Sequence, residues 1–486
     1  MIIATAEEIR RAEQELFAGG SVTSAELMDA VIERLWHAWQ REPLTAGLHP
    51  QRVVVYAGKG NNAGDALGFA ARFGCPVTLR AVCGVEELSP DSRRELYRIT
   101  APLDSNAPQP QPGLLIIDGL LGSGARGELR PAYADLVREM NTLRAESPRS
   151  LLLSIDIPTG LNADNGRGGA HVVMADITAA IGCVKPGMLV DGAEDAVGRL
   201  LCIPLPEVKL TPCADAQVLC PELTRGWLPR RPYSHFKNRV GRVGIIAGSK
   251  GMIGAAQMCA EAAVAAGAGL VNLYCPEEVY DLLAARITPE VMVSPLLPSF
   301  MHSAQSVQAW VIGPGIGHQN KPRAAELQHL INHAKCPVVL DADALNTAAE
   351  RGWTFRSNHI LTPHPGEMSR LYPTGGGRRR DIAQRFPEMH PCTLLLKGAR
   401  SIIANREQLY YNTTGGPFMA NGGQGDVLAG VIGALAAQGL PPLRAASLGA
   451  CACGRAAEAA LAAAGYPPAI RAGQVITHLP QALAGC

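Results

Sequence analysis

The chain has 486 residues, of which 47% are hydrophobic and 18% charged, and its formal net charge is +1. This length exceeds what one hydrophobic core ordinarily organises, so we expect two domains, and the composition is that of a folded chain. A net charge so close to zero creates no overall field to attract nucleic acid or an anionic membrane. We therefore expect neither as a partner, and any phosphate binding must be local.

Thirteen cysteines are scattered along the chain without a CxxC pair. This pattern favours free thiols in a reducing compartment over a structural metal site. The first residues, MIIATAEEIRRAEQELF, lack the basic start and apolar core of a signal peptide. No stretch of about 18 residues is free of polar interruption, so no membrane span is expected. The predicted location is the cytoplasm.

The first half of the chain contains short apolar runs that end in glycine or aspartate, with helix-like stretches between several of them. Continuous apolar strands that alternate with helices are typical of a parallel sheet covered on both faces. The predicted fold class is therefore α/β. The strand-like runs lie at residues 52–58, 76–82, 113–122, 150–158 and 174–182.

The same pattern starts again at residue 241. Between residues 203 and 233 the chain is rich in proline and polar residues, which predicts a linker and the entry to the second domain. We expect domains at residues 1–210 and 222–486, and a surface loop at GGGRRR, residues 375–380. The second series of strand-like runs lies at residues 241–249, 269–275, 310–317, 337–345, 359–367 and 393–403.

Polar side chains gather where strands of the first domain end, the edge at which open parallel sheets bind ligands. One segment reads as strand, glycine turn and helix, and it offers Asn61, Asn62 and Asp65 at the helix start. Helix capping is the alternative role for these residues. Asp118 and Asp156 end two further strands. Carboxylate, amide and hydroxyl oxygens suit a hard cation, and glycine turns suit a phosphate-bearing ligand.

The second domain places Asp426 within MANGGQGDVLAG, where glycine-rich backbone becomes an apolar helix. Free backbone N–H groups and the helix dipole make such a junction an anion site. A carboxylate there repels a phosphate, so it either acts beside one or caps the helix. His364, between two prolines, and Lys397, after an apolar run, are further candidates. A loop histidine and a surface lysine are the alternatives for these two residues.

The motifs GKGNNAGD, IDGLLGSG, SIDIPTGLNADNG and ADITAAIGCVKPGML resemble the epimerase domain of the NAD(P)H-hydrate repair enzymes. The resemblance covers most of residues 1–205. It implies a Rossmann-like three-layer domain that interconverts the R and S forms of hydrated NADH and NADPH. It also implies a potassium ion held by Asn62, Asp118 and Thr159 and a catalytic role for Asp156. The hydrate contacts that it implies are Asn61, Asn62, Ala63, Gly64, Asp65, Gly122, Ser123, Gly124, Ala125, Arg126, Gly127, Glu128 and Asp156.

Ala63 and Ala66 depart from this pattern, because the family usually has glycine at both positions. An added methyl group can block a close backbone approach or a positive φ. A binding or assembly module that lacks catalysis is therefore the alternative interpretation of the first domain.

The second domain contains GSKGMIGAA, GPGIG, LDADALN, LTPHPGE, LLKGA and GGQGDVLAG in one order. This series resembles the nucleotide-dependent NAD(P)H-hydrate dehydratases, which are ribokinase-like and usually ADP-dependent in bacteria. The resemblance spans about residues 225–480 and implies that Asp426 removes a proton from the attacking hydroxyl. It implies hydrate contacts at Ala255, Gly317, His364 and Asp426, and nucleotide contacts at Lys397, Gly398, Ala399, Arg400, Ser401 and Gly425.

Together the two resemblances imply a cytoplasmic repair enzyme in which an isomerase is joined to a lyase. Epimerisation would use K⁺, and dehydration of the S hydrate would use ADP with Mg²⁺, giving NAD(P)H, AMP and phosphate. The expected partners are NADHX, NADPHX and ADP, and a homo-oligomer is expected. The alternative is a ribokinase-like small-molecule kinase with a non-catalytic N-terminal domain, although a kinase leaves the fused first domain unexplained.

Overall fold

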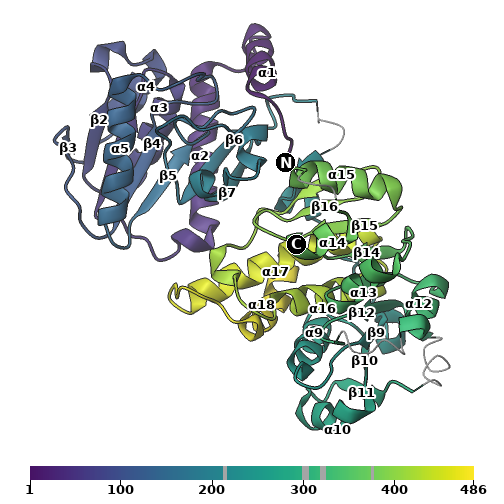
Figure 1. Cartoon of the computed structure of the whole chain (residues 1–486). Helices are drawn as coiled ribbons and strands as arrows, with labels where there is room; N and C mark the ends of the chain where they lie inside the picture. Colours follow the sequence, from purple (N-terminus) through teal and green to yellow (C-terminus); the bar gives the residue numbers. More distant parts are fainter. Residues whose placement is uncertain (212–215, 298–305, 318–323, 374–376, 486) are drawn as a thin grey trace. The chain divides into compact units, whose positions relative to one another are not determined.

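The computed structural model describes the chain except for residues 212–215, 298–305, 318–323, 374–376 and 486. The chain divides into two compact units, Met1–Val218 and Leu219–Cys486. Each unit combines a β-sheet with helices, so the predicted α/β class is confirmed (Figure 1). Within the described residues, no helix combines the length and the apolar character needed to cross a membrane.

Unit 1 has a parallel seven-stranded sheet in the order β3-β2-β1-β4-β5-β6-β7. The strand order reverses between β1 and β4, which is where such sheets bind ligands. The strands are β1 (Arg52–Ala57), β2 (Val77–Ala81), β3 (Leu103–Asp104), β4 (Leu114–Gly119), β5 (Leu151–Ile155), β6 (Ile177–Gly182) and β7 (Arg199–Pro204), and β8 (Ala216–Val218) ends the unit. The helices are α1 (Ala6–Ala18), α2 (Ser24–Arg41), η1 (Pro43–Thr45), α3 (Asn61–Ala71), η2 (Val85–Glu87), α4 (Pro90–Tyr97), α5 (Pro131–Glu146), η3 (Pro186–Leu189) and α6 (Glu194–Val197).

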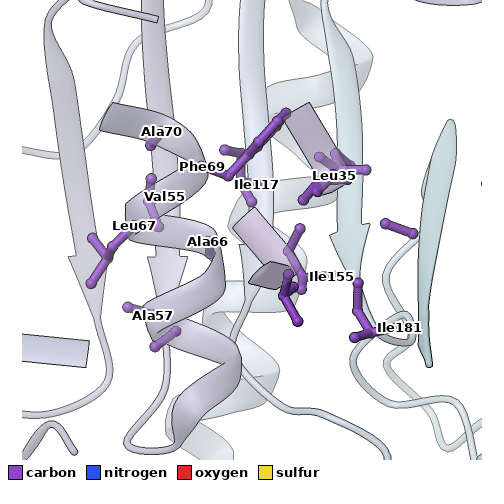
Figure 2. Packing of buried hydrophobic residues seen from close by; sticks show 14 of the residues in the cluster. Leu35, Val55, Ala57, Ala66, Leu67, Phe69, Ala70, Ile117, Ile155 and Ile181 are labelled. Atoms are coloured by element: carbon purple, nitrogen blue, oxygen red, sulfur yellow. The ribbon is translucent and has the colours of Figure 1, made fainter. Parts of the chain in front are cut away.

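Helices cover both faces of this sheet, because alternate residues of its strands are buried on opposite sides. Val55 of β1 belongs to a core with Leu35 of α2 and Phe69 of α3. Its neighbour Tyr56 belongs to a second core with Met140 of α5. Figure 2 shows α3 laid along the sheet in the first of these cores. The predicted three-layer arrangement of the first domain is confirmed.

Unit 2 orders its strands β11-β10-β9-β12-β13-β14-β15-β16-β17, and all pairs from β11 to β15 are parallel. The strands are β9 (Arg242–Ile246), β10 (Leu270–Cys275), β11 (Val291–Pro295), β12 (Ala309–Ile312), β13 (Val338–Leu340), β14 (His359–Leu361), β15 (Thr393–Leu396), β16 (Ile402–Ala404) and β17 (Leu409–Tyr411). The helices are α7 (Pro221–Thr224), α8 (Lys237–Val240), α9 (Ile253–Ala265), α10 (Glu277–Arg286), α12 (Ala324–His333), α13 (Asp343–Arg351), α14 (Pro365–Leu371), α15 (Arg379–Met389), η6 (Pro417–Met419), α16 (Gln424–Ala437), α17 (Pro442–Ala463) and α18 (Ala472–Ala484).

The expectation of a wholly parallel sheet is wrong at one edge of unit 2. The apolar run at 393–403 has a strand-like part on each side of Lys397 and Gly398, and these parts form a hairpin in which β15 and β16 pair antiparallel. The strand β17 continues this pattern. Parallel neighbours need a crossover of a dozen or more residues, whereas only residues 397–401 connect these two strands. Lys397 therefore begins a tight turn at the end of a buried strand.

Small residues let α9 and α16 approach each other closely. A Cβ atom added to Gly430 of α16 would lie 2.0 Å from the carbonyl oxygen of Cys259 in α9. On the sheet side, a Cβ at Gly433 would lie 2.3 Å from a methyl carbon of Val311 in β12. These contacts fix α16, which carries Asp426 in its first turn, against α9 and the sheet.

One expectation about a connecting segment needs correction. Arg379 and Arg380 of the predicted GGGRRR surface loop are the first residues of α15, because arginine favours a helix far more than glycine does. Residues 375 and 376 of that stretch lie outside the described residues. The proline-rich region at 203–233, predicted as a linker and the entry to the second domain, contains β8 and α7.

Candidate active sites

Asp156 is the centre of the candidate site in unit 1. It follows β5 directly and has φ = +67°, a conformation uncommon for residues other than glycine. Its carboxylate accepts a hydrogen bond of 2.8 Å from the backbone N–H of Ser123 and forms an ion pair with the Lys185 ammonium. A strained backbone, a loop N–H and a cation thus hold one carboxylate at the end of a strand.

Lys185 is almost entirely buried, with a side chain 1% exposed. Its ammonium also donates to the carbonyl oxygens of Ile181, at 2.9 Å, and Cys183, at 3.2 Å. Burial, the largest single influence, would lower the pKa of Lys185, but the charge and hydrogen bond of Asp156 together with Cys183 and Glu13 hold this pKa above the ordinary value. Lys185 therefore stays charged and is a fixed counter-ion for Asp156.

Asp118 ends β4 and is fully buried. Burial raises the pKa of its carboxyl, although four hydrogen bonds favour the charged form. The donors are the backbone and hydroxyl of Thr159, at 2.8 and 2.7 Å, the Ser154 hydroxyl at 2.9 Å and the Leu120 N–H at 3.2 Å. The predicted pair Asp118 and Thr159 is thus in direct contact.

Asn62 lies beside the same strand ends. A Cβ atom added to Gly122 would lie 3.7 Å from Cβ of Asn62 and 3.3 Å from Oδ2 of Asp156, so both side chains lie against the face of Gly122 that lacks a side chain. The Nδ2 atom of Asn62 is buried and has no hydrogen-bond partner. Because an amide can be turned about its last bond, its oxygen can occupy that position instead. A buried carboxylate and an unpaired amide fit the donor set of a monovalent cation.

The remaining predicted residues of this site differ in what they can offer a ligand. Asn61 is exposed and hydrogen-bonded to Ser24 and Ser89, at 3.2 and 2.8 Å. Ala63 and Gly64 are buried within α3, so only their backbone can face a ligand. Burial and the charge of Asp156 raise the pKa of Asp65 well above its ordinary value. The predicted loop residues Gly124, Arg126, Gly127 and Glu128 are exposed, and Gly122, Ser123 and Ala125 are half-buried.

The two alanines that depart from the family pattern adopt helical conformations within α3. The side chains of Ala63 and Ala66 are fully buried in the core of unit 1, and Figure 2 shows Ala66 there. A Cβ built on Gly119 would lie 2.6 Å from Cβ of Ala66, so this methyl group fills space against the β4 end. Neither alanine needs a positive φ.

Asp426 occupies the predicted junction in unit 2. It is the third residue of α16, after Gly423 caps the helix with φ = +92°. Burial, followed by the negative charge of Asp341, raises the pKa of Asp426 to about 6, and Lys397 opposes this shift. The side chain of Asp426 makes no cap to the helix N-terminus in the described structure, since Gly423 is the capping residue. At neutral pH the carboxylate is largely ionised and able to accept a proton.

Lys397 connects this junction to two other strand ends. Its ammonium lies 2.8 Å from Oδ1 of Asp341 and 3.8 Å from Oε2 of Glu367. A Cβ atom added to Gly425 would lie 3.4 Å from the ammonium and 3.7 Å from Asp341 Oδ2. Burial would lower the pKa of Lys397, but Asp341 and Glu367 together raise it. Lys397 is therefore a half-buried cation next to the N-terminus of α16, not a surface lysine.

His364 is the N-cap of α14 rather than an unstructured loop residue. Its Nδ1 accepts hydrogen bonds from the backbone N–H groups of Gly366, at 3.0 Å, and Glu367, at 3.3 Å. Its Nε2 lies 3.5 Å from Oε1 of Glu367, which also contacts Lys397. Glu367 thus connects His364 to the cluster around Asp426. The imidazole remains half-exposed and accessible to a ligand.

Gly317 and Ala255 both lie at the glycine turn that follows β12. The N–H of Gly317 donates to Oδ2 of Asp343 at 2.8 Å, and its φ of +79° suits glycine. Ala255, in the first turn of α9, has its Cβ 3.0 Å from a Cβ built on Gly315. The two predicted hydrate contacts therefore flank one glycine turn after β12.

Comparison with known proteins decides the family of this chain. Residues 243–481 match the family described as NAD(P)H-hydrate dehydratase, and residues 23–187 match the family of YjeF-related protein N-termini. The bifunctional NAD(P)H-hydrate repair enzyme Nnr of Moorella thermoacetica is 32% identical over 99% of this chain and 97% of its own length. That of Escherichia coli is 36% identical over 93% and 88%. This chain belongs to the bifunctional NAD(P)H-hydrate repair enzymes.

The fold of unit 2 also agrees with a solved structure. A ribokinase-like superfamily protein from Enterococcus faecalis matches 57% of this chain and 98% of its own length, with a TM-score of 0.50 and 24% identity. At that identity the likeness shows the fold alone. The predicted ribokinase-like architecture of the second domain is confirmed.

Three charged residues of this repair enzyme were not among the predicted site residues. Lys185 pairs with Asp156, and Asp341 and Glu367 both contact Lys397. Each stands in a quoted motif, directly after a strand or at a helix start, which is the signal that could have identified it. Their roles depend on partners 29 to 56 residues away, and spacing along the chain does not show such contacts.

Proposed function

We propose that this chain repairs hydrated NADH and NADPH, with epimerisation of the R and S hydrates in unit 1 and dehydration of the S hydrate in unit 2. The observation that carries the proposal is the position of Asp426. It lies at a glycine-capped helix N-terminus beside Gly425 and the Lys397 ammonium, with a pKa of about 6. Such a carboxylate is suited to remove a proton next to a bound phosphate.

Dehydration needs a better leaving group than hydroxide. The hydrate carries a hydroxyl at C6 of the reduced nicotinamide ring. Asp426 takes the proton of this hydroxyl. The hydroxyl oxygen attacks the terminal phosphorus of ADP at the same time, and AMP leaves. The ring nitrogen then donates its electron pair, the C6–O bond breaks, phosphate departs, and loss of a ring proton completes NADH. The net reaction converts hydrate and ADP into NADH, AMP, phosphate and a proton.

In this proposal, different residues of unit 2 bind the nucleotide and the hydrate. Lys397 and the turn from Gly398 to Ser401 contact the nucleotide, together with the backbone of Gly425. His364, Ala255 and Gly317 contact the hydrate. Among the described residues, no three His, Cys, Asp or Glu side chains are grouped to hold a metal ion. Mg²⁺ would enter with the nucleotide phosphates, which is how Mg²⁺ commonly binds in phosphoryl-transfer sites.

In unit 1, Asp156 contacts the nicotinamide portion of the hydrate and assists proton transfer. Lys185 keeps the carboxylate oriented through their ion pair, and the Ser123 N–H fixes its other oxygen. The strained φ of Asp156 supports a functional role, because such conformations concentrate at active sites. The loop from Gly122 to Glu128 and the segment from Asn61 to Asp65 enclose the rest of the substrate.

We also propose that Asn62, Asp118 and Thr159 hold K⁺ beside this site. A cation would relieve the cost of burying Asp118 and would give the unpaired Asn62 amide a partner. Asp118→Ala should therefore lower hydrate affinity and remove the dependence of epimerisation on K⁺, whereas Asp156→Ala should keep that dependence and lose rate. A K⁺ titration of both variants checks this. An Asp118→Ala enzyme with the K⁺ dependence of the wild type contradicts the assignment.

The decisive experiment incubates the wild-type chain with mixed R and S hydrates, ADP and Mg²⁺. Complete recovery of NADH absorbance with release of AMP and phosphate supports both activities, once spontaneous epimerisation is subtracted. A stable phosphorylated alcohol without NADH would instead identify a kinase. Recovery that stops at the S fraction would identify unit 1 as a binding or assembly module.

The cytoplasm and a homo-oligomeric assembly complete the proposal. The free thiols, among them the buried Cys183, Cys259 and Cys453, support a reducing compartment. Mass measurement of the purified chain in solution tests the assembly, and a monomer at micromolar concentration would contradict it.

A further inference from the structure

Arg379 contacts the turn that connects β15 to β16, and the proposed mechanism assigns it no role. Its guanidinium donates hydrogen bonds to the carbonyl oxygens of Ala399, at 2.8 Å, and of Leu396 and Lys397, both at 3.4 Å. One planar cation therefore contacts two carbonyl groups of the five-residue turn and the last carbonyl group of β15. Arginine suits this task because its five N–H donors form a rigid fork.

The turn needs such support, because its backbone is strained. Gly398 has φ = +146° and Arg400 has φ = +53°, a region that residues other than glycine rarely enter. A Cβ atom added to Gly398 would lie 2.8 Å from one guanidinium nitrogen of Arg379 and 3.1 Å from its central carbon. The guanidinium thus lies directly against the Gly398 backbone, and only glycine leaves room for it.

The direction of the carbonyl groups determines where the turn presents its N–H groups. In a trans peptide the C=O and the next N–H point in opposite directions. Since the Lys397 carbonyl faces Arg379, the N–H of Gly398 faces away from it. The N–H of Lys397 is fixed separately, by a 2.9 Å bond to the Pro363 carbonyl. Arg379 therefore fixes the backbone on the C-terminal side of Lys397, and Pro363 fixes the N-terminal side.

The same contacts place the Lys397 ammonium. With its backbone held on both sides, Lys397 extends to within 2.8 Å of Asp341 and lies beside Gly425 at the N-terminus of α16. The helix start, the ammonium and the Gly398 N–H are all groups that favour an anion. A change in the turn would move the ammonium and the N–H groups together, while the hydrate contacts at Gly317 and Ala255 lie on other segments.

We propose that Arg379 is a positioning residue for the nucleotide: it holds residues 397–401 in the shape that receives the phosphate groups of a nucleoside diphosphate. This inference rests on the proposed function of unit 2. Arg379 is assigned no contact with the reacting atoms, because its two terminal nitrogens donate to backbone carbonyls of the turn and of the end of β15. Its effect is on nucleotide affinity, exerted through the turn.

The test compares Arg379→Gln and Arg379→Lys with Arg378→Gln as the matched control. Arg378 is the exposed neighbouring arginine, whose backbone caps α15. We expect Arg379→Gln to raise the KM for ADP about tenfold or more, a range set by charge-assisted hydrogen bonds. The KM for the hydrate should stay within about twofold. Arg379→Lys should recover part of the ADP affinity, and Arg378→Gln should match the wild type.

Two further measurements distinguish a loss of fold stability in the Arg379 variants from a specific loss of nucleotide binding. Calorimetric titration with ADP alone reports nucleotide binding without the hydrate reaction, and thermal unfolding reports the fold. ADP affinity unchanged in Arg379→Gln overturns the inference, as does an equal loss of ADP and hydrate affinity with a lowered Tm. If the wild type binds ADP but does not dehydrate hydrates, the proposed function fails while the role of Arg379 is still measured by this titration.

Discussion

At the scale of single residues, the carboxylates of the two sites have different charged surroundings. Asp156 in unit 1 forms an ion pair with the buried Lys185 ammonium. Asp426 in unit 2 lies near Asp341, and burial with this like charge raises its pKa to about 6. A pKa close to neutral allows a carboxylate to be ionised at the start of the reaction and still accept a proton readily. The environments therefore match different tasks.

Asp426→Asn tests the proposed base directly. Asparagine keeps the size of the side chain but cannot accept the proton, so dehydration should fall about 100-fold or more. Epimerisation, measured as the rate at which the R to S ratio equilibrates, should remain that of the wild type. Asp281→Asn, which alters an exposed carboxylate on α10, is the control. Near-normal NADH recovery by Asp426→Asn would remove this residue from the mechanism.

The raised pKa of Asp426 also predicts two dependences on pH. Below about pH 6 the carboxylate becomes protonated and cannot act as a base, so the rate of dehydration should fall as pH decreases through this value.

A carboxyl whose folded-state pKa is raised destabilises the fold when it ionises. This cost in the free energy of unfolding is absent below about pH 4 and complete above about pH 6. The shift corresponds to at most about 3 kcal/mol at 1.36 kcal/mol per unit.

Asp426→Asn should therefore increase the free energy of unfolding at pH 7 and leave it unchanged at pH 4. Denaturant unfolding of both proteins at the two pH values measures this difference. A variant that is less stable at pH 7 would show that the carboxylate is stabilised by its surroundings, which contradicts the raised pKa.

At the scale of elements, the sequence predicts the central strands well, because both sheets are built from continuous apolar runs that end in glycine or aspartate. It predicts the α16 junction for the same local reason. It does not predict the β15–β16 hairpin, because an apolar run has the same appearance in parallel and antiparallel strands. Nor does it predict the contacts of Arg379 and Lys185. Each contacts carbonyl groups or carboxylates that only the folded chain brings near.

The crossing of α9 and α16 gives a prediction at this scale. Gly430→Ala puts a methyl group 2.0 Å from the Cys259 carbonyl, where both backbones are held by the sheet. We expect a loss of about 1–3 kcal/mol in the free energy of unfolding, as for other overpacked sites. Gly473→Ala in α18, where an added Cβ meets nothing within 4 Å, is the matched control and should be neutral or stabilising. Equal stability of the two variants would contradict the close approach of α9 and α16.

At the scale of the whole molecule, each unit contains a complete set of candidate residues on its own sheet. The contacts of Asp156 all come from unit 1, and those of Lys397 all come from unit 2. The two reactions are also complementary in chemistry, since the dehydratase uses only the S hydrate and the epimerase replenishes it. If the hydrate diffuses freely from one site to the other, the two active sites need not belong to the same chain.

Mixing two inactive-site variants tests this independence. Asp426→Asn keeps only the epimerase, and Asp156→Ala keeps only the dehydratase. With mixed hydrates, ADP and Mg²⁺, the first variant alone should recover no NADH, and the second should stop at the S fraction apart from slow spontaneous epimerisation. An equimolar mixture of the two full-length variants should convert both hydrates completely to NADH. If the mixture recovers no more than Asp156→Ala alone, the hydrate does not pass between chains, and the two units must act on it within one molecule.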